Sequence, residues 1–146
     1  MAMKKFLMYA IGAIGIIGTF AFGGKMSVEA HTNGGFGWDG RLYDNNGNVV
    51  VNDFVFDGFY TYYAQADGTP MKDRLTYHPD GQHIIYFDGE GHEVFSDFKY
   101  CASVGYTCYF DSQGYIYKDQ ITYVDGVPYY LNGNGKLEDA GWFRFA

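Results

Sequence analysis

The chain has 146 residues, of which 17 are acidic and 10 are basic, and 21% are aromatic. This composition excludes an intrinsically disordered chain, because abundant aromatic residues and a charged fraction of only 18% allow extensive burial of apolar surface. A net charge of −7 argues against a nucleic-acid partner, since such affinity depends mainly on basic side chains that neutralise phosphates. The length fits one domain or one repeat array.

Residues 1–30 have the layout of a secretory signal peptide. Lys4 and Lys5 precede an uncharged, mainly apolar run at residues 6–22, and Ala30 offers a small residue for cleavage. We expect cleavage after Ala30 and a secreted protein; a retained membrane anchor is the alternative, because this run exceeds the usual length of about 7–15 residues. Cleavage removes three lysines and one glutamate, which leaves 7 basic and 16 acidic side chains and a net charge of −9.

Five similar segments divide the rest of the chain into units of about 22 residues. Each segment carries an aromatic residue and ends in a glycine, and the glycines are spaced 21, 23, 23 and 21 residues apart: Gly47, Gly68, Gly91, Gly114 and Gly135. A second turn signal lies upstream in each unit, at Asp39-Gly40, Asp57-Gly58, Asp80-Gly81, Val104-Gly105 and Asp125-Gly126. Such dipeptides between β-branched and aromatic runs predict hairpins with type I′ turns, which need positive φ at both central residues.

The repeats predict an all-β fold, an elongated solenoid of stacked β-hairpins. Short runs such as 84–87 and 106–110 suit half-buried strands, and no segment after residue 30 shows helical periodicity. A lone hairpin is marginal in water, but stacked hairpins bury their aromatic faces against their neighbours. We expect residues 31–41 at one end, while Gly141-Trp142 resembles the start of a further unit. An uncovered last unit favours self-association, so a homodimer is a further hypothesis.

The stretch from Thr122 to Trp142 resembles the cell-wall-binding repeat shared by choline-binding modules and glucan-binding domains of Gram-positive surface proteins. The matching positions, in the order of that pattern, are Asp125-Gly126, the aromatic pair Tyr129-Tyr130, the polar turn from Asn132 to Gly135, Leu137 and Gly141-Trp142. The resemblance extends over residues 38–146. It implies a secreted, non-catalytic module at the cell surface that attaches to envelope polysaccharide, whether glucan, peptidoglycan or teichoic acid.

Two further roles stay open for such repeats: a host-glycan-binding adhesin or toxin-like region, and a structural spacer of a larger surface protein. Choline recognition needs a cage of aromatic side chains, but Ile121 and Pro128 occupy the corresponding places. A glucan or another wall polymer therefore fits better. The sequence contains no nucleophile elbow, zinc-protease motif or phosphate loop, so we expect no enzyme activity and no cofactor.

Six aromatic residues lie at less regular positions, near the expected hairpin junctions, and are the candidate ligand contacts: Trp38, Tyr60, Tyr77, Tyr100, Tyr123 and Trp142. Their rings offer flat apolar faces, which suit the C–H faces of sugars, and tyrosine and tryptophan add a polar group. The regular aromatic residues are expected in the core, namely Tyr63, Tyr86, Phe87, Tyr109, Phe110 and Tyr130. The turn aspartates are expected to shape turns, and His78, His83 and His92 to lie on the surface without binding metal.

Cys101 and Cys108 are the only cysteines in the sequence. A two-residue turn at Val104-Gly105 would place them opposite each other across a hairpin, so a disulfide is geometrically feasible in an exported chain. Closing so short a loop would stabilise the fold by about 2–3 kcal/mol at most. A disulfide and a pair of thiols both remain open here, and the spacing does not match a zinc site.

Overall fold

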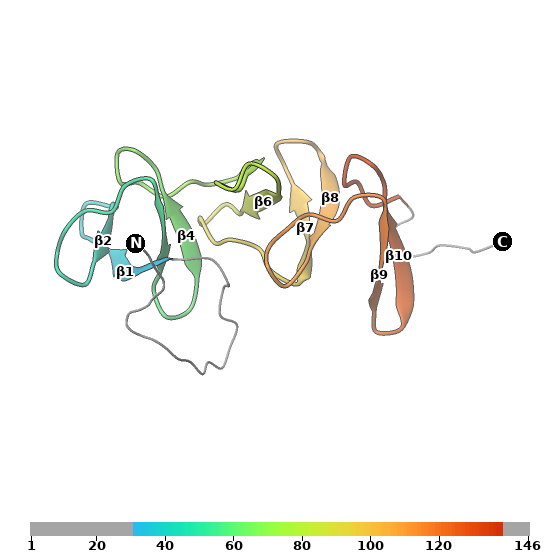
Figure 1. The fold of residues 1–146 in the computed structure, drawn as a ribbon, viewed down its shortest axis with the longest axis horizontal. Coiled ribbons are helices and arrows are strands. Elements are labelled where there is room, and N and C mark those ends of the chain that lie inside the picture. The colour runs from blue at the N-terminus through green and yellow to red at the C-terminus, as the bar shows by residue number, and fades with distance from the viewer. Residues whose placement is uncertain (1–30, 139–146) are drawn as a thin grey trace. The chain divides into compact units, whose positions relative to one another are not determined.

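The computed structural model describes residues 31–138, so the expected signal segment and Trp142 lie outside the described part. The strands are β1 (Thr32–Phe36), β2 (Leu42–Asp44), β3 (Asp53–Phe56), β4 (Thr61–Ala64), β5 (Arg74–Tyr77), β6 (Ile84–Phe87), β7 (Asp97–Cys101), β8 (Tyr106–Phe110), β9 (Gln120–Val124) and β10 (Val127–Leu131). Each odd-numbered strand pairs with the strand that follows it as an antiparallel hairpin (Figure 1). The predicted all-β class of hairpin repeats is confirmed. Between residues 31 and 138 there is no helix long and apolar enough to cross a membrane.

The chain divides into two compact units between Thr69 and Pro70. In the first unit, β1 pairs antiparallel with β2 and parallel with β3, which gives the strand order β2-β1-β3-β4. The Gly-rich segment 31–41, expected at an end of the array, therefore supplies an inner strand of this sheet. Gly34 permits the close pairing of β1 with β2, because a Cβ at this position would overlap the carbonyl oxygen of Tyr43.

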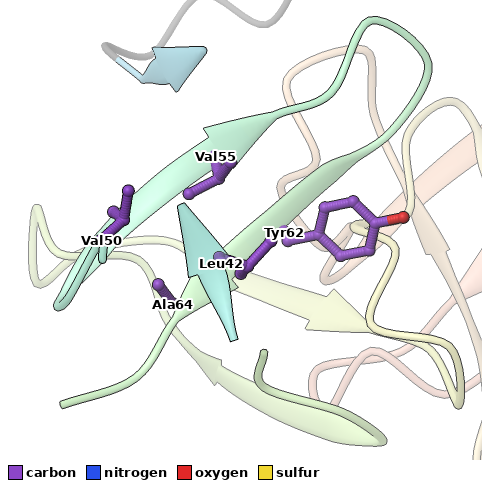
Figure 2. Packing of buried hydrophobic residues seen from close by; sticks show 5 residues of the cluster. All are labelled: Leu42, Val50, Val55, Tyr62 and Ala64. Carbon is purple, nitrogen blue, oxygen red and sulfur yellow. The ribbon is translucent and has the colours of Figure 1, made fainter. Parts of the chain in front are cut away.

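The core of the first unit brings together β2, β3, β4 and the loop after β2 (Figure 2). Leu42, Val50, Val55, Tyr62 and Ala64 form one cluster, in which no side chain is more than 8% exposed. Burial of one such Leu or Val side chain contributes roughly 1.5–3 kcal/mol. The backbone follows the same contacts, since the Leu42 amide donates to the carbonyl of Gly68 and the Val50 amide donates to that of Leu42.

In the second unit, three hairpins are linked by loops that reach back to an earlier hairpin. The Ile116 amide, in the loop after β8, donates to the carbonyl of Ile84 in β6 at 2.9 Å. The Leu137 amide, in the loop after β10, donates to the carbonyl of Thr107 in β8 at 2.8 Å. A buried cluster lies between the first two of these hairpins and contains Tyr86, Val94, Cys101, Cys108 and Phe110.

A four-residue turn follows the second strand of each hairpin and ends at the repeated glycine. In the turn that begins at Asp111, one carboxylate oxygen accepts hydrogen bonds from the amides of Gln113 and Tyr115, at 2.8 and 2.9 Å. The Gly114 amide donates to the Asp111 carbonyl, and Gly114 has a φ of 86°. The turns at Asp44, Asp88 and Asn132 repeat this arrangement. The predicted turn-forming role is confirmed for Asp88 and Asp111.

The hairpin turns differ from the prediction of type I′ geometry. Only the β9–β10 turn has positive φ at both central residues, with 52° at Asp125 and 78° at Gly126. At the other dipeptides only the glycine has positive φ. The β7–β8 connection illustrates the reason, because Cys101 pairs with Tyr106 and four residues therefore separate the paired positions.

This longer turn corrects the expected placement of the cysteines. Cys101 lies opposite Tyr106, and Cys108 lies opposite Lys99, so the two cysteines are diagonal neighbours and not a directly opposed pair. Both are free thiols, and both side chains are fully buried. The hydrogen bond with the Cys108 thiol and the loss of solvation raise the pKa of Cys101.

The predicted core residues are buried to different degrees. Tyr86, Phe87 and Phe110 are at most 1% exposed, as expected. Tyr63, Tyr109 and Tyr130 are only half-buried. The core also contains smaller residues that the aromatic pattern does not single out: Leu42, Val55, Ala64, Ile85 and Leu131.

Candidate functional site

Three of the predicted ligand-contacting tyrosines occupy equivalent positions in the second unit. Tyr77, Tyr100 and Tyr123 each lie four residues after a non-glycine residue with positive φ that precedes a hairpin: Asp73 (49°), Ser96 (49°) and Asp119 (50°). The exposed fractions of the three tyrosines are 63%, 60% and 64%. Equivalent backbone geometry therefore presents an exposed phenol ring three times.

The left-handed residues are a feature that the sequence analysis missed. The amides of Asp73, Ser96 and Asp119 donate to the carbonyls of the residues that begin the following four-residue turns, at 2.9–3.0 Å. Asn and Asp tolerate positive φ better than other non-glycine residues, and Asn52 holds the equivalent place in the first unit. Had the repeats been aligned at their turn glycines, the position five residues after each glycine would have been seen to hold mostly Asn or Asp.

The strands that carry Tyr77 and Tyr100 pack the same face against the following hairpin. Side chains two residues apart on a strand share a face. Two residues before Tyr77, Leu75 packs on the buried cluster that contains both cysteines. Two residues before Tyr100, the ring of Phe98 lies 4.8 Å from that of Tyr129 in the next hairpin. Tyr77 and Tyr100 therefore continue an inter-hairpin packing face to its solvent-exposed end, whereas Ile121, two residues before Tyr123, is itself 36% exposed.

The three phenol rings are available to a ligand. Across the hairpin they face Ile84, Thr107 and Pro128, so no aromatic side chain lies directly opposite any of them. Within residues 31–138, these tyrosine side chains make no hydrogen bond or ring contact. A flat ring with both an apolar face and a polar hydroxyl can bind a sugar by stacking and hydrogen bonding.

The equivalent position in the first unit is different. Phe56, four residues after Asn52, is half-buried, and its ring lies 5.4 Å from that of His31 in an edge-to-face arrangement. Tyr60 is 49% exposed but lies in the β3–β4 turn, next to Phe59, which is 84% exposed. The register therefore brings Tyr77, Tyr100 and Tyr123 into one series and leaves Tyr60 outside it.

Trp38 lies in the β1–β2 turn and is 98% exposed. Beside it, the Asp39 carboxylate accepts hydrogen bonds from the Tyr43 hydroxyl at 2.7 Å and from Arg41 Nε at 2.8 Å. Arg41 Nη2 also donates to the Tyr43 hydroxyl at 3.0 Å, which closes the network. The bond from Tyr43, followed by those from Arg41, lowers the pKa of Asp39 to about 2. This network was not predicted from the sequence, although its three members are spaced two residues apart.

The histidines form a second polar cluster near the β5–β6 turn. The ring of His83 stacks on that of Tyr115 at 3.8 Å, and its Nδ1 lies 2.6 Å from an Asp80 carboxylate oxygen. A backbone amide of Gln82 and the bond with His83 lower the pKa of Asp80. The His83 side chain is 41% exposed, but that of His78 is only 13% exposed, so the predicted surface position fits His83 better. No group of three potential metal ligands occurs in the described part of the chain.

Comparison with solved structures identifies similar folds. A truncated alternansucrase from Leuconostoc mesenteroides matches 70% of this chain with a TM-score of 0.59 and 25% sequence identity. An alternansucrase in complex with isomaltotriose matches with the same values. The modular Cpl-1 endolysin, complexed with a peptidoglycan analogue, matches 83% of this chain with a TM-score of 0.51 and 16% identity.

The match covers only part of each similar protein. This chain corresponds to 10% of the length of the alternansucrase and 42% of that of the endolysin. No family model matches the sequence, and no curated protein matches it either. The comparisons therefore show a shared fold over most of this chain.

Proposed function

We propose that this chain is a non-catalytic glycan-binding module whose main contact surface is the series Tyr77, Tyr100 and Tyr123. The observation that carries the proposal is the repetition of one exposed ring in one backbone setting. Isolated exposed aromatic residues are common on proteins and need no explanation. Three exposed rings in equivalent backbone positions match a ligand that is itself a repeating polymer.

The ligand class follows from the surroundings of these rings. Because Ile84, Thr107 and Pro128 lie across from the tyrosines, a cation would meet a single ring and not a cage. A sugar needs only one flat face for stacking. The similar structures were solved with isomaltotriose and with a peptidoglycan analogue, which supports a glycan ligand for this chain as well. We therefore favour a glucan or peptidoglycan strand over choline.

The proposal extends to location. A secreted protein bound to envelope polysaccharide agrees with the signal-like layout of residues 1–30 and with the exported character of cell-wall-binding repeats. Weak sites on one chain gain avidity when they engage one polymer together, by a factor of about 10²–10⁴. The repeated tyrosines would thus hold the protein on the wall without any single strong site.

Co-sedimentation tests the proposal. The full chain is mixed with purified cell-wall sacculi, with and without teichoic acids, and with an insoluble α-glucan. We expect the protein to pellet with at least one of these polymers. The triple variant Tyr77→Ala, Tyr100→Ala, Tyr123→Ala should lose about 100-fold in apparent affinity, because both the stacking and the avidity are removed. The triple Tyr→Phe variant should retain most of the binding, since it keeps the rings.

The matched control is Phe59→Ala, which removes an even more exposed ring outside the tyrosine series. It should pellet like the unmodified chain. The proposal fails if a folded chain stays in the supernatant with every wall polymer, or if the triple alanine variant binds unchanged. In the first case, binding to host glycans or a spacer role becomes the better explanation.

A further inference from the structure

We propose that the β1–β2 turn is a separate sugar-binding subsite, in which the Trp38 indole stacks on a neutral hexopyranose ring and Arg41 and Asp39 hydrogen-bond its adjacent hydroxyl groups. The subsite shares with the proposed function only the class of ligand, since it shares no residue with the tyrosine series. It lies in the first unit, and the tyrosines lie in the second.

Two observations on the same turn support this subsite. The first is the indole, which is almost entirely exposed at 98%. The second is the hydrogen-bond network beside it, which fixes the Arg41 guanidinium through Asp39 and Tyr43. In the β3–β4 turn beside Phe59, the Asp57 carboxylate accepts hydrogen bonds from the amides of Phe59 and Tyr60 and from the Tyr62 hydroxyl at 3.3 Å, but no arginine takes part. Exposure alone would not distinguish these two turns, but the Arg41 guanidinium does.

The local backbone is adapted to this network. A Cβ at Gly37 would overlap the ring of Tyr43, so glycine allows the tyrosine to lie against the turn. Gly40 adopts a φ of 82°, which returns the chain so that the Gly37 amide reaches the Arg41 carbonyl at 2.8 Å. The side chains of Asp39, Arg41 and Tyr43, which follow Trp38 in the chain, are therefore held in place before any ligand binds, and this reduces the entropy cost of binding.

The free hydrogen-bonding capacity suits a pair of neighbouring hydroxyl groups. Arg41 uses Nε and Nη2 within the network, and its Nη1 group has no partner among residues 31–138. A hydroxyl oxygen can accept from this guanidinium, while an adjacent hydroxyl can donate to the remaining lone pairs of the Asp39 carboxylate. An indole face beside one donor and one acceptor is complementary to the apolar face and the vicinal hydroxyls of one sugar ring.

Charge selects a neutral sugar over an acidic one. Arg41 is the only Lys or Arg between residues 31 and 69, and this segment also carries five aspartates. The Asp39 carboxylate lies 2.8 Å from Arg41 Nε, which largely compensates the positive charge. A uronate or a phosphate-bearing sugar would therefore meet no net positive charge at this turn, within a segment whose overall charge is negative.

Tryptophan fluorescence tests the subsite. Because the chain has only two tryptophans, Trp142→Phe leaves Trp38 as the single reporter. In this background the full chain is titrated with maltotriose and isomaltotriose as neutral probes and with trigalacturonate as an acidic probe. We expect at least one neutral probe to change the Trp38 emission in a saturable way, and Arg41→Met to weaken that binding about tenfold or more. Phe59→Ala should leave the titration unchanged.

Three outcomes would overturn the subsite: no saturable change in Trp38 emission with either neutral probe, tighter binding of trigalacturonate, or unchanged affinity in Arg41→Met with a native circular dichroism spectrum. The readout is separate from co-sedimentation. A saturable Trp38 response in a chain whose wall binding does not depend on the tyrosines would refute the proposed tyrosine series and keep the subsite.

Discussion

Substitution of Gly68 by alanine tests whether the repeated turn glycine serves in packing as well as in backbone conformation. Gly68 and Gly47 hold equivalent turns of the first unit, with φ values of 86° and 84°. A Cβ at Gly47 would meet nothing within 4 Å, whereas a Cβ at Gly68 would lie 2.6 Å from Val49 Cγ2 and 3.2 Å from Arg41 Cδ. Gly47→Ala is therefore the matched control, since it carries the conformational cost without the contact.

The expected costs differ for this reason. An L-residue in left-handed conformation costs about 1–2 kcal/mol, which applies to both variants. Forcing an extra methyl group into a packed contact adds about 1–3 kcal/mol for Gly68→Ala, so its total is about 2–5 kcal/mol. Val49 has little freedom to move away, because its side chain is β-branched and its backbone pairs with Tyr43.

Hydrogen exchange of the Leu42 and Val50 amides measures these costs, since both amides are hydrogen-bonded within the first unit. Exchange should accelerate about 5- to 30-fold in Gly47→Ala and about 30-fold or more in Gly68→Ala. Adding Val49→Ala to Gly68→Ala should return the rate toward that of Gly47→Ala. Equal acceleration in the two single variants, or no recovery in the double variant, would refute the packing role.

Three further outcomes follow from the structure. Ser96→Gly should increase stability by up to about 1 kcal/mol in urea denaturation, because Ser96 has a φ of 49° and glycine removes the strain; a loss of stability would contradict this. Since the pKa of Asp39 is lowered, its ionised form stabilises the fold above its ordinary value of 3.8, and this contribution is lost as the pH falls toward about 2. In Tyr43→Phe, a carboxyl titration by NMR should show the pKa of Asp39 rising toward 3.8, and an unchanged midpoint would exclude the hydrogen bond as the main cause. Cys101 and Cys108 should react with iodoacetamide only after denaturation, because both are fully buried; denatured chain that yields no thiols without reductant would instead show a disulfide.

The repeat period predicted the hairpins and their turn glycines because each of these features depends on residues only a few positions apart in the sequence. Asp88 and Asp111 form their turns through bonds to amides two and four residues ahead, so no distant partner is needed. Tyr77 was predicted as a ligand contact because it lies outside the regular aromatic pairs, and its exposed fraction of 63% is compatible with that role.

Features that depend on strand register were harder to predict. A two-residue turn at Val104-Gly105 would place Cys101 opposite Cys108, but the observed four-residue β7–β8 turn makes them diagonal neighbours. The Val104-Gly105 dipeptide alone does not indicate at which residue strand pairing begins. The network of Arg41 with Asp39 and Tyr43 was missed because it requires knowing which side chains share a strand face. Likewise, the sequence placed Tyr60 and Tyr77 in one group, and only the register separates them.

The loops that reach back to an earlier hairpin bear on how such a chain can change in length. The bonds from Ile116 to Ile84 and from Leu137 to Thr107 join backbone groups, which almost every residue type supplies. If one unit were duplicated in tandem, the backbone groups of the new unit could form the same hydrogen bonds to the preceding hairpin, because these bonds do not depend on side chains. The side chains opposite the exposed rings, at Ile84, Thr107 and Pro128, can then differ from one unit to the next. Each added unit can therefore acquire its own ligand preference without loss of the backbone hydrogen bonds between hairpins.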